Sequence, residues 1–193
     1  AHAALELDGQ QARKHAPLAL DLNGIAKGVG VDRLAEVLDG FGITDALAGI
    51  DGEMRAMGLR PDGEAWNIAV EAPDADRRTP HSMLALQDAA VATSGDYRHW
   101  VDVQGRRLSH TMDPIHRTPL SASPASVTVV ARTCVEADAW ATALMVLGPK
   151  RAFAFSEKNR LDALMLMRDA TGELSTTAFG PLFNAFGPDC GVS

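Results

Sequence analysis

Residues 126–149, SVTVVARTCVEADAWATALMVLGP, decide the fold that this sequence predicts. Residues 126–131 are rich in β-branched side chains and indicate a strand. Thr133 and Glu136 follow in the Thr-x-x-Glu pattern of a helix capping box. Gly148 and Pro149 are stop signals for that helix. The stretch therefore predicts a strand that leads directly into a long helix ending near Gly148.

The chain after this helix continues as a second helix and a hairpin. The second helix is expected over residues 150–157. Apolar runs at 161–167 and 174–179 flank a Thr171-Gly172 turn, an order typical of two antiparallel strands. The C-terminal part thus predicts strand, helix, helix and hairpin.

The chain before residue 126 is a series of short apolar runs separated by turn residues, with one helix among them. That helix is expected from apolar residues recurring at i, i+3, i+4 and i+7 from Val31, and Gly40 and Gly42 are its stop signals. Neighbouring strands without regular β-α-β alternation predict an α+β fold with a mostly antiparallel sheet, organised as a single domain over residues 1–193. The strands expected here cover 18–22, 43–50, 54–59, 66–70, 83–86, 100–103 and 108–110.

Composition narrows the classes of partner. Lys and Arg total 18 against 25 Asp and Glu, which gives a net charge of −7 and argues against nucleic acid as the main partner. An anionic ligand would then need a local source of positive charge, such as a metal ion or a helix N-terminus. Cys134 and Cys190 form neither a metal motif nor a disulfide framework.

Residues 21–28, DLNGIAKG, place a carboxylate, a flexible turn and a lysine where an expected strand meets an expected helix. Free N–H groups at a helix start and the charge of Lys27 favour a phosphate there. Gly24 lets the backbone approach a ligand or offer it a carbonyl oxygen. The same residues also suit a tight turn with a surface lysine, because the spacing matches no standard phosphate loop.

Asp138 and Thr142 are four residues apart on the capped helix and therefore share a face. A carboxylate and a hydroxyl are hard oxygen donors suited to Mg²⁺, which keeps waters and adds phosphate oxygens of a substrate. The ordinary alternative is an Asp favoured near a helix start and a Thr bonded back to its own helix.

Two further segments carry polar groups at expected strand ends. His110, in residues 109–114 (SHTMDP), could act as a general base near neutral pH, or be a structural histidine. Thr93, Ser94 and Gly95 form part of an expected hydroxyl-rich turn that could donate to phosphate or ribose, or serve only as a turn.

Taken together, these segments resemble the ApbE family of FAD:protein FMN transferases. Five family motifs occur here in family order, although each is weak alone. They are DLNGIAKG at 21–28, DGE at 51–53, ATSGDY at 92–97, SHTMDP at 109–114 and DAWATAL at 138–144.

The resemblance implies roles for these residues. The carbonyl of Gly24 and the side chains of Asp138 and Thr142 would hold Mg²⁺. Asp21 and Lys27 would contact FAD. The remaining implied flavin and diphosphate contacts are His110, Thr111, Thr93, Ser94 and Gly95, with His110 and Asp138 as the catalytic candidates.

The implied reaction moves FMN from FAD to a Thr or Ser hydroxyl of an acceptor protein and releases AMP. Water as the acceptor would make the same site an FAD pyrophosphatase, and loss of turnover would leave a non-catalytic flavin-binding protein. The family also implies a periplasmic location at the outer face of the inner membrane, with a membrane tether outside this chain.

Several positions depart from the family pattern. Asn23 and Asp51 stand where the family has glycine, Thr111 replaces an isoleucine, and Ile115-His116-Arg117 replaces Arg-Thr-Gly. The family's N-terminal region, which supplies a strand and part of the flavin pocket, is expected to be missing from this chain.

Overall fold

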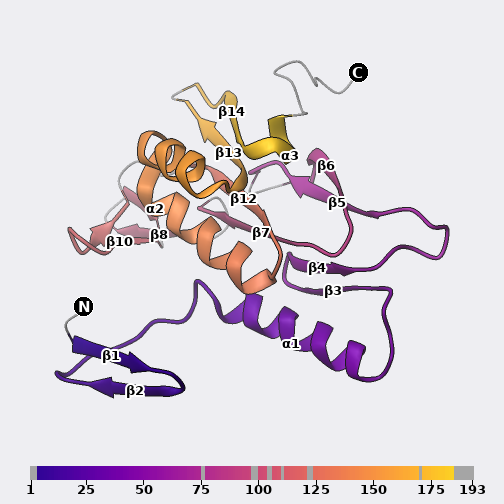
Figure 1. Cartoon of the computed structure of the whole chain (residues 1–193). Helices are drawn as coiled ribbons and strands as arrows, with labels where there is room; N and C mark the ends of the chain where they lie inside the picture. Colours follow the sequence, from indigo (N-terminus) through magenta and orange to yellow (C-terminus); the bar gives the residue numbers. More distant parts are fainter. Residues whose placement is uncertain are drawn as a thin grey trace.

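The computed structural model describes residues 4–74, 77–96, 100–103, 106–109, 111–120, 124–169 and 171–184. Its elements alternate between short strands and a few helices, as the α+β prediction requires (Figure 1). Within these ranges, none of the helices has the length and apolar character needed to cross a bilayer. The elements are β1 (Leu5–Asp8), β2 (Gln11–Lys14), α1 (Ala26–Gly40), β3 (Ala46–Ile50), β4 (Glu53–Met57), β5 (Trp66–Glu71), β6 (Pro80–Leu86), β7 (Ala90–Gly95), β8 (Trp100–Val103), β9 (Arg106–Ser109), β10 (Met112–Asp113), β11 (Thr118–Pro119), β12 (Ser126–Ala131), α2 (Cys134–Asn159), β13 (Asp162–Arg168), β14 (Leu174–Phe179) and α3 (Gly180–Asn184).

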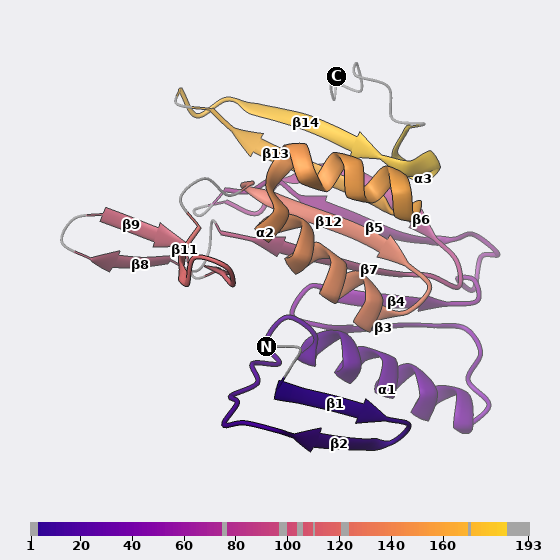
Figure 2. The same cartoon turned by 60° about the vertical axis from the view of Figure 1, so that its left-hand side comes forward.

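The largest sheet in the described chain has six strands in the order β14-β13-β12-β7-β4-β3, and every pairing in it is antiparallel. Helices α1 and α2 lie side by side along this sheet (Figure 2). Val127 and Val129 of β12 pack beneath α2, and Ala48 of β3 packs beneath α1. One sheet face therefore carries both helices.

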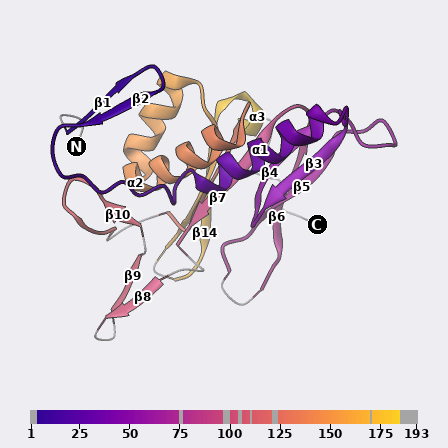
Figure 3. The same ribbon diagram turned by 90° about the horizontal axis from the view of Figure 1, so that it is seen from below.

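The opposite face is covered by the β5–β6 hairpin and α3. Ile68 and Leu84 of the hairpin and Phe183 of α3 are buried against Val91 and Leu164 of the large sheet. The apolar alternation along β5 and β6 serves this layer. The β8–β9 hairpin instead projects away from the layers (Figure 3).

The strand-to-helix prediction at residues 126–149 is confirmed. Thr133 is the N-cap of α2 and its hydroxyl accepts a hydrogen bond from the N–H of Glu136. Gly148 has non-helical angles (φ 69°, ψ 169°) and kinks the helix, so α2 consists of two helical parts as expected. The helix from Val31, the terminal hairpin and the strands beginning near residues 43, 54, 66, 83 and 100 are confirmed as well.

Two local predictions were wrong. Residues 18–22 form no strand; the leucines at 20 and 22 are exposed, and the carbonyl of Leu22 accepts hydrogen bonds from the N–H groups of Ile25 and Ala26 at the entry to α1. Thr93, Ser94 and Gly95 are not a turn but the end of β7, where they pair with β12. In both cases strand formation depends on a partner strand, which alternation within one segment does not reveal.

Candidate functional site

Helices α1 and α2 touch backbone to backbone where each begins. A Cβ added to Gly28 would lie 2.6 Å from the carbonyl oxygen of Cys134 and 2.7 Å from the Cα of Val135. Real Cβ contacts are not this short, so only glycine allows the approach. The glycine that ends the DLNGIAKG segment therefore brings the first turn of α1 against the first turn of α2.

Asp138 of α2 closes this junction from one side. Its Oδ2 accepts a hydrogen bond from the N–H of Gly28 at 2.9 Å, and the residue is only 3% exposed. Ile25, the N-cap of α1, makes no side-chain cap of its own. A helix start leaves N–H groups without intrahelical partners, so the Asp138 carboxylate serves as the cap of α1 from 110 residues away.

Gly24 and Thr142 meet one turn further along α2. A Cβ on Gly24 would lie 3.3 Å from both Oγ1 and Cγ2 of Thr142, and Gly24 does not have positive φ. A side chain at this position would therefore crowd Thr142, whereas the backbone angles of Gly24 do not require a glycine. Ser94 joins from β7, with its hydroxyl 3.1 Å from Thr142 Oγ1. The sequence-predicted residues Gly24, Asp138, Thr142 and Ser94 therefore line one junction.

Lys27, next to Gly28 in the first turn of α1, pairs with Glu53, a residue to which the sequence motifs assigned no role. Its Nζ lies 2.6 Å from Oε1 of Glu53 and 3.9 Å from Oδ2 of Asp51. The Glu53 side chain is 3% exposed, and its other oxygen, Oε2, is buried with no hydrogen-bond partner among the described residues. Burial raises the pKa of Glu53, and Lys27 partly counteracts that rise.

The signal for Glu53 was its place in the DGE segment. That segment is the β3–β4 turn, where Asp51 has φ 48° and Gly52 φ 101°. Two successive positive φ values suit a tight hairpin turn, and aspartate tolerates the left-handed region better than most residues. The departure from the family at Asp51 is therefore accommodated, and the turn directs Glu53 towards Lys27.

Other candidate residues lie apart from this junction or beyond the described ranges. Thr93 faces the opposite side of β7 from Ser94, and its hydroxyl is 2.8 Å from that of Thr128. Asp21 is exposed and accepts a hydrogen bond from the N–H of Asn23. Thr111 is half-buried, and its N–H donates to the Ser109 hydroxyl. His110 lies outside the described residues.

Gly95 ends β7 and pairs with Ser126 of β12. Gly95 therefore lies at the strand end, next to Ser94.

The donor set of the junction suits a hard cation. The carboxylate of Asp138, the hydroxyl of Thr142 and the backbone at Gly24 offer oxygen only, and oxygen donors are what Mg²⁺ prefers. In the described part of the chain, no three His, Cys, Asp or Glu side chains converge as a metal cluster. An ion at the junction would therefore depend on backbone, hydroxyl and ligand oxygens beside Asp138.

Fold and junction together define the class: an α+β protein whose oxygen-rich candidate metal site lies between the starts of two packed helices. Comparison with known proteins then identifies the family. The ApbE family model matches residues 1–165, and the chain belongs to the ApbE family.

Named relatives and solved structures agree with this family. The FAD:protein FMN transferase of Vibrio cholerae is 39% identical over 183 residues, covering 93% of this chain and 55% of that protein. That of Escherichia coli is 33% identical over 178 residues, covering 92% and 50%. The apo crystal structure of the Pseudomonas stutzeri flavinyl transferase ApbE is similar with a TM-score of 0.83 at 38% identity, covering 100% of this chain and 58% of that one. The chain thus spans about half the length of these relatives.

Proposed function

We propose that this chain forms the metal-binding core of an FAD:protein FMN transferase. The observation that carries the proposal is the junction itself, where Gly24 lies against Thr142 and Asp138 caps α1, with Lys27 in the first turn of the same helix. The names of the relatives support flavin transfer as the reaction.

The residues of the junction would bind the diphosphate of FAD together with Mg²⁺. The Gly24 carbonyl, Asp138 and Thr142 would hold the cation, and the Lys27 ammonium would contact a phosphate oxygen. A bound Mg²⁺ would neutralise charge on the diphosphate and stabilise AMP as the leaving group. Lys27 is held against Glu53, so its charge is already oriented before the substrate arrives.

The proposed chemistry is a phosphoryl transfer with a protein hydroxyl as nucleophile. The Thr or Ser oxygen of the acceptor forms a bond to the phosphorus of the FMN half, and the bond between that phosphorus and the bridging oxygen breaks. AMP leaves with the bridging oxygen, and the hydroxyl proton passes to a base, for which we propose His110.

The flavin contacts belong to the same proposal. Asp21, Thr111 and Gly95 would contact FAD beside His110. Ser94 would act through the hydroxyl that it directs at Thr142, and Thr93 would support the floor of the pocket through its pairing with Thr128.

The test combines the protein with FAD, Mg²⁺ and an acceptor peptide that carries a Thr flavinylation site. Mass spectrometry should find FMN bound to the acceptor and an equal amount of AMP. AMP without an adduct would show that the chain hydrolyses FAD instead of transferring FMN, and absence of both products would refute catalysis by this chain.

A pair of valine substitutions assigns the reaction to the junction. Thr142→Val keeps the shape of the side chain but removes the hydroxyl, so Mg²⁺-dependent product formation should fall. Thr44→Val removes an exposed hydroxyl that donates a hydrogen bond to Asp45, far along the chain from the junction residues, and product formation should be unchanged in this variant. Equal activity in both variants would contradict the role of Thr142.

We further propose that the protein works at the outer face of the bacterial inner membrane, through a tether outside this chain. Fractionation of the native host should place it in the periplasmic or membrane fraction. Recovery with cytoplasmic markers alone would contradict this location.

A further inference from the structure

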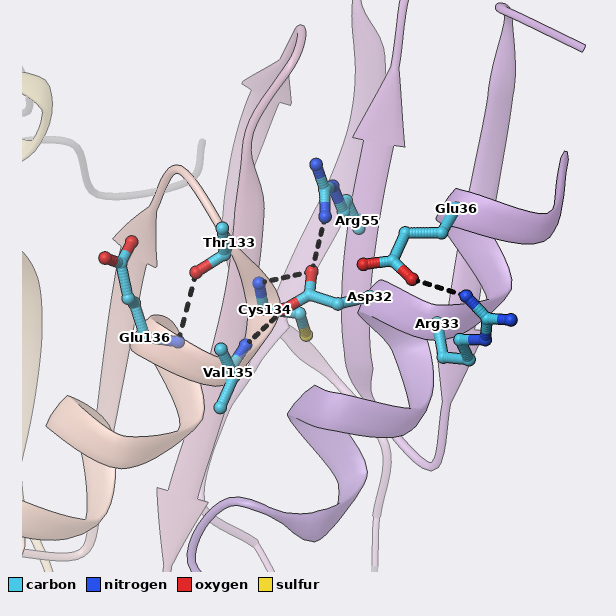
Figure 4. Close-up of polar contacts among 8 residues, drawn as sticks. All are labelled: Asp32, Arg33, Glu36, Arg55, Thr133, Cys134, Val135 and Glu136. Atoms are coloured by element: carbon cyan, nitrogen blue, oxygen red, sulfur yellow. Dashed lines mark hydrogen bonds and ion pairs between the residues drawn. The ribbon is translucent and has the colours of Figure 1, made fainter. Parts of the chain in front are cut away.

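A second carboxylate, Asp32, crosses the same helix junction in the opposite direction. It stands on α1 and is 9% exposed. Its Oδ1 accepts from the N–H of Cys134 and its Oδ2 from the N–H of Val135, each at 2.9 Å. Asp32 therefore occupies the first two N–H groups of α2, as Figure 4 shows.

The two helices consequently cap each other. Asp138 of α2 binds the N–H of Gly28 on α1, and Asp32 of α1 binds the first N–H groups of α2. Each bond joins residues more than 100 positions apart, so neither can be replaced by local turn structure. Hydrogen bonds to a charged acceptor are stronger and shorter than neutral ones, which makes the pair an effective clamp.

Arg55 fixes the Asp32 side chain from the sheet. Its Nη1 lies 2.7 Å from Asp32 Oδ1, and its side chain is 29% exposed. Arg55 belongs to β4, two residues from Glu53, so the same strand orients Asp32 and Lys27. The clamp thus joins α1, α2 and β4 at one place.

The α2 helix already has an ordinary cap, so Asp32 is not required for that purpose alone. Thr133 accepts from the N–H of Glu136 at the same helix start. What Asp32 adds is a link to α1, and along α2 this link lies one turn before Asp138 and two turns before Thr142. A shift of α2 against α1 would move Thr142 away from Gly24.

We propose that Asp32 is a positioning residue that sets the spacing between Gly24 on one side and Asp138 and Thr142 on the other. The expected effect of Asp32 on cation binding rests on the function proposed above. Its effect on the spacing of the two helices does not depend on any ligand. Loss of Asp32 should weaken cation binding by loosening the junction, and it should expose the Gly28 N–H to exchange.

The decisive variant is Asp32→Asn, which keeps the size of the side chain and removes its charge. We expect its dissociation constant for Mn²⁺, measured by electron paramagnetic resonance, to rise about tenfold, the lower end of the cost of removing an outer-shell partner. Hydrogen exchange at Gly28 in the metal-free protein should accelerate in parallel.

Two matched controls separate positioning from helix stability. Thr133→Ala removes the ordinary cap of α2 and leaves the link to α1 in place. Glu36→Gln alters an exposed α1 carboxylate that pairs with Arg33 of the same helix, away from α2 in Figure 4. Thr133→Ala should lower the melting temperature, and neither control should change the Mn²⁺ affinity or Gly28 exchange.

The proposal is overturned if Asp32→Asn lowers the melting temperature but matches Thr133→Ala in both Mn²⁺ affinity and Gly28 exchange. If Asp32→Asn does not fold, Arg55→Gln is the second variant, because it keeps both hydrogen bonds of Asp32 to the backbone of α2. It should weaken Mn²⁺ binding and accelerate Gly28 exchange to a smaller extent, and unchanged values of both would likewise refute the positioning role. Failure of the wild-type chain to bind Mn²⁺ would refute the proposed metal site, whereas Gly28 exchange would still decide the role of Asp32.

Discussion

The α1–α2 junction and the β10–β11 segment both contain residues of the ApbE motifs, but different kinds of contact hold the two regions in place. At the junction, buried carboxylates bind backbone N–H groups more than 100 residues away. In the β10–β11 segment, Asp113 instead accepts from the N–H groups of Ile115 and His116 and from the His116 ring, all within three residues, and most of the segment is exposed. The difference indicates that long-range contacts fix the α1–α2 junction, whereas the β10–β11 segment is organised by local contacts.

Asp138→Asn should have the largest effect on the α1–α2 junction. It removes the charge that would face the cation and leaves an oxygen able to accept from Gly28. Mn²⁺ affinity should fall by more than the roughly 10- to 100-fold expected for an outer-shell residue, with transfer activity lost in proportion. Glu136→Gln, on the exposed first turn of the same helix, is the control, and equal Mn²⁺ affinity of the two variants would remove Asp138 from the site.

Gly28→Ala tests whether the junction is as tight as the contacts indicate. The new Cβ would meet the backbone of Cys134 and Val135, which cannot rotate away. We expect a loss of about 1–3 kcal/mol in the free energy of unfolding, the usual cost of overpacking. Gly40→Ala at the other end of α1 meets nothing within 4 Å, and chemical denaturation should show no loss of stability for it.

Glu53→Gln should change how stability depends on pH. Burial raises the pKa of Glu53 in the folded protein above its ordinary value of 4.5, so the stability associated with this group is present at lower pH and is lost as the pH rises through the folded-state pKa. Relative to wild type, Glu53→Gln should therefore gain stability in denaturation experiments as the pH rises from below 4.5 through the folded-state pKa of Glu53. A constant difference across this range would contradict the unfavourable burial of the Glu53 charge.

His116→Ala should have the smallest effect because its contacts are local and exposed. The His116 side chain and backbone hold the pKa of Asp113 at about 2. Removal of the ring should raise this pKa towards 3.8 in an NMR titration, because the largest cause of the lowered pKa is the hydrogen bond from the His116 ring. Ile115→Ala keeps the backbone donor and serves as control; a melting temperature altered by His116→Ala would show that the segment is coupled to the core.

The same contrast explains which features the sequence could predict. The cap at Thr133, the kink at Gly148 and the hairpins follow from residues close together in the chain, and the structure confirms them. The gathering of Gly24 with Thr142 was predicted only through the family resemblance, because no local pattern joins segments so far apart.

Long-range effects account for what was mispredicted or missed. The alternating leucines at 18–22 resemble a strand but find no partner strand among the described residues. Asp32 belongs to none of the sequence motifs, and its contacts with α2 arise only when α1 packs against that helix. Glu53 was visible in a motif, yet its contact with Lys27 depends on how β4 lies beneath α1.

Anomalous diffraction from crystals soaked in Mn²⁺ tests the central claim most directly, because it places the ion without reference to activity. We predict one strong peak at the junction, about 2.1–2.2 Å from the Gly24 carbonyl oxygen, an Asp138 carboxylate oxygen and the Thr142 hydroxyl, close to the octahedral distances of Mg²⁺. A peak elsewhere on the chain, with none between α1 and α2, would contradict it.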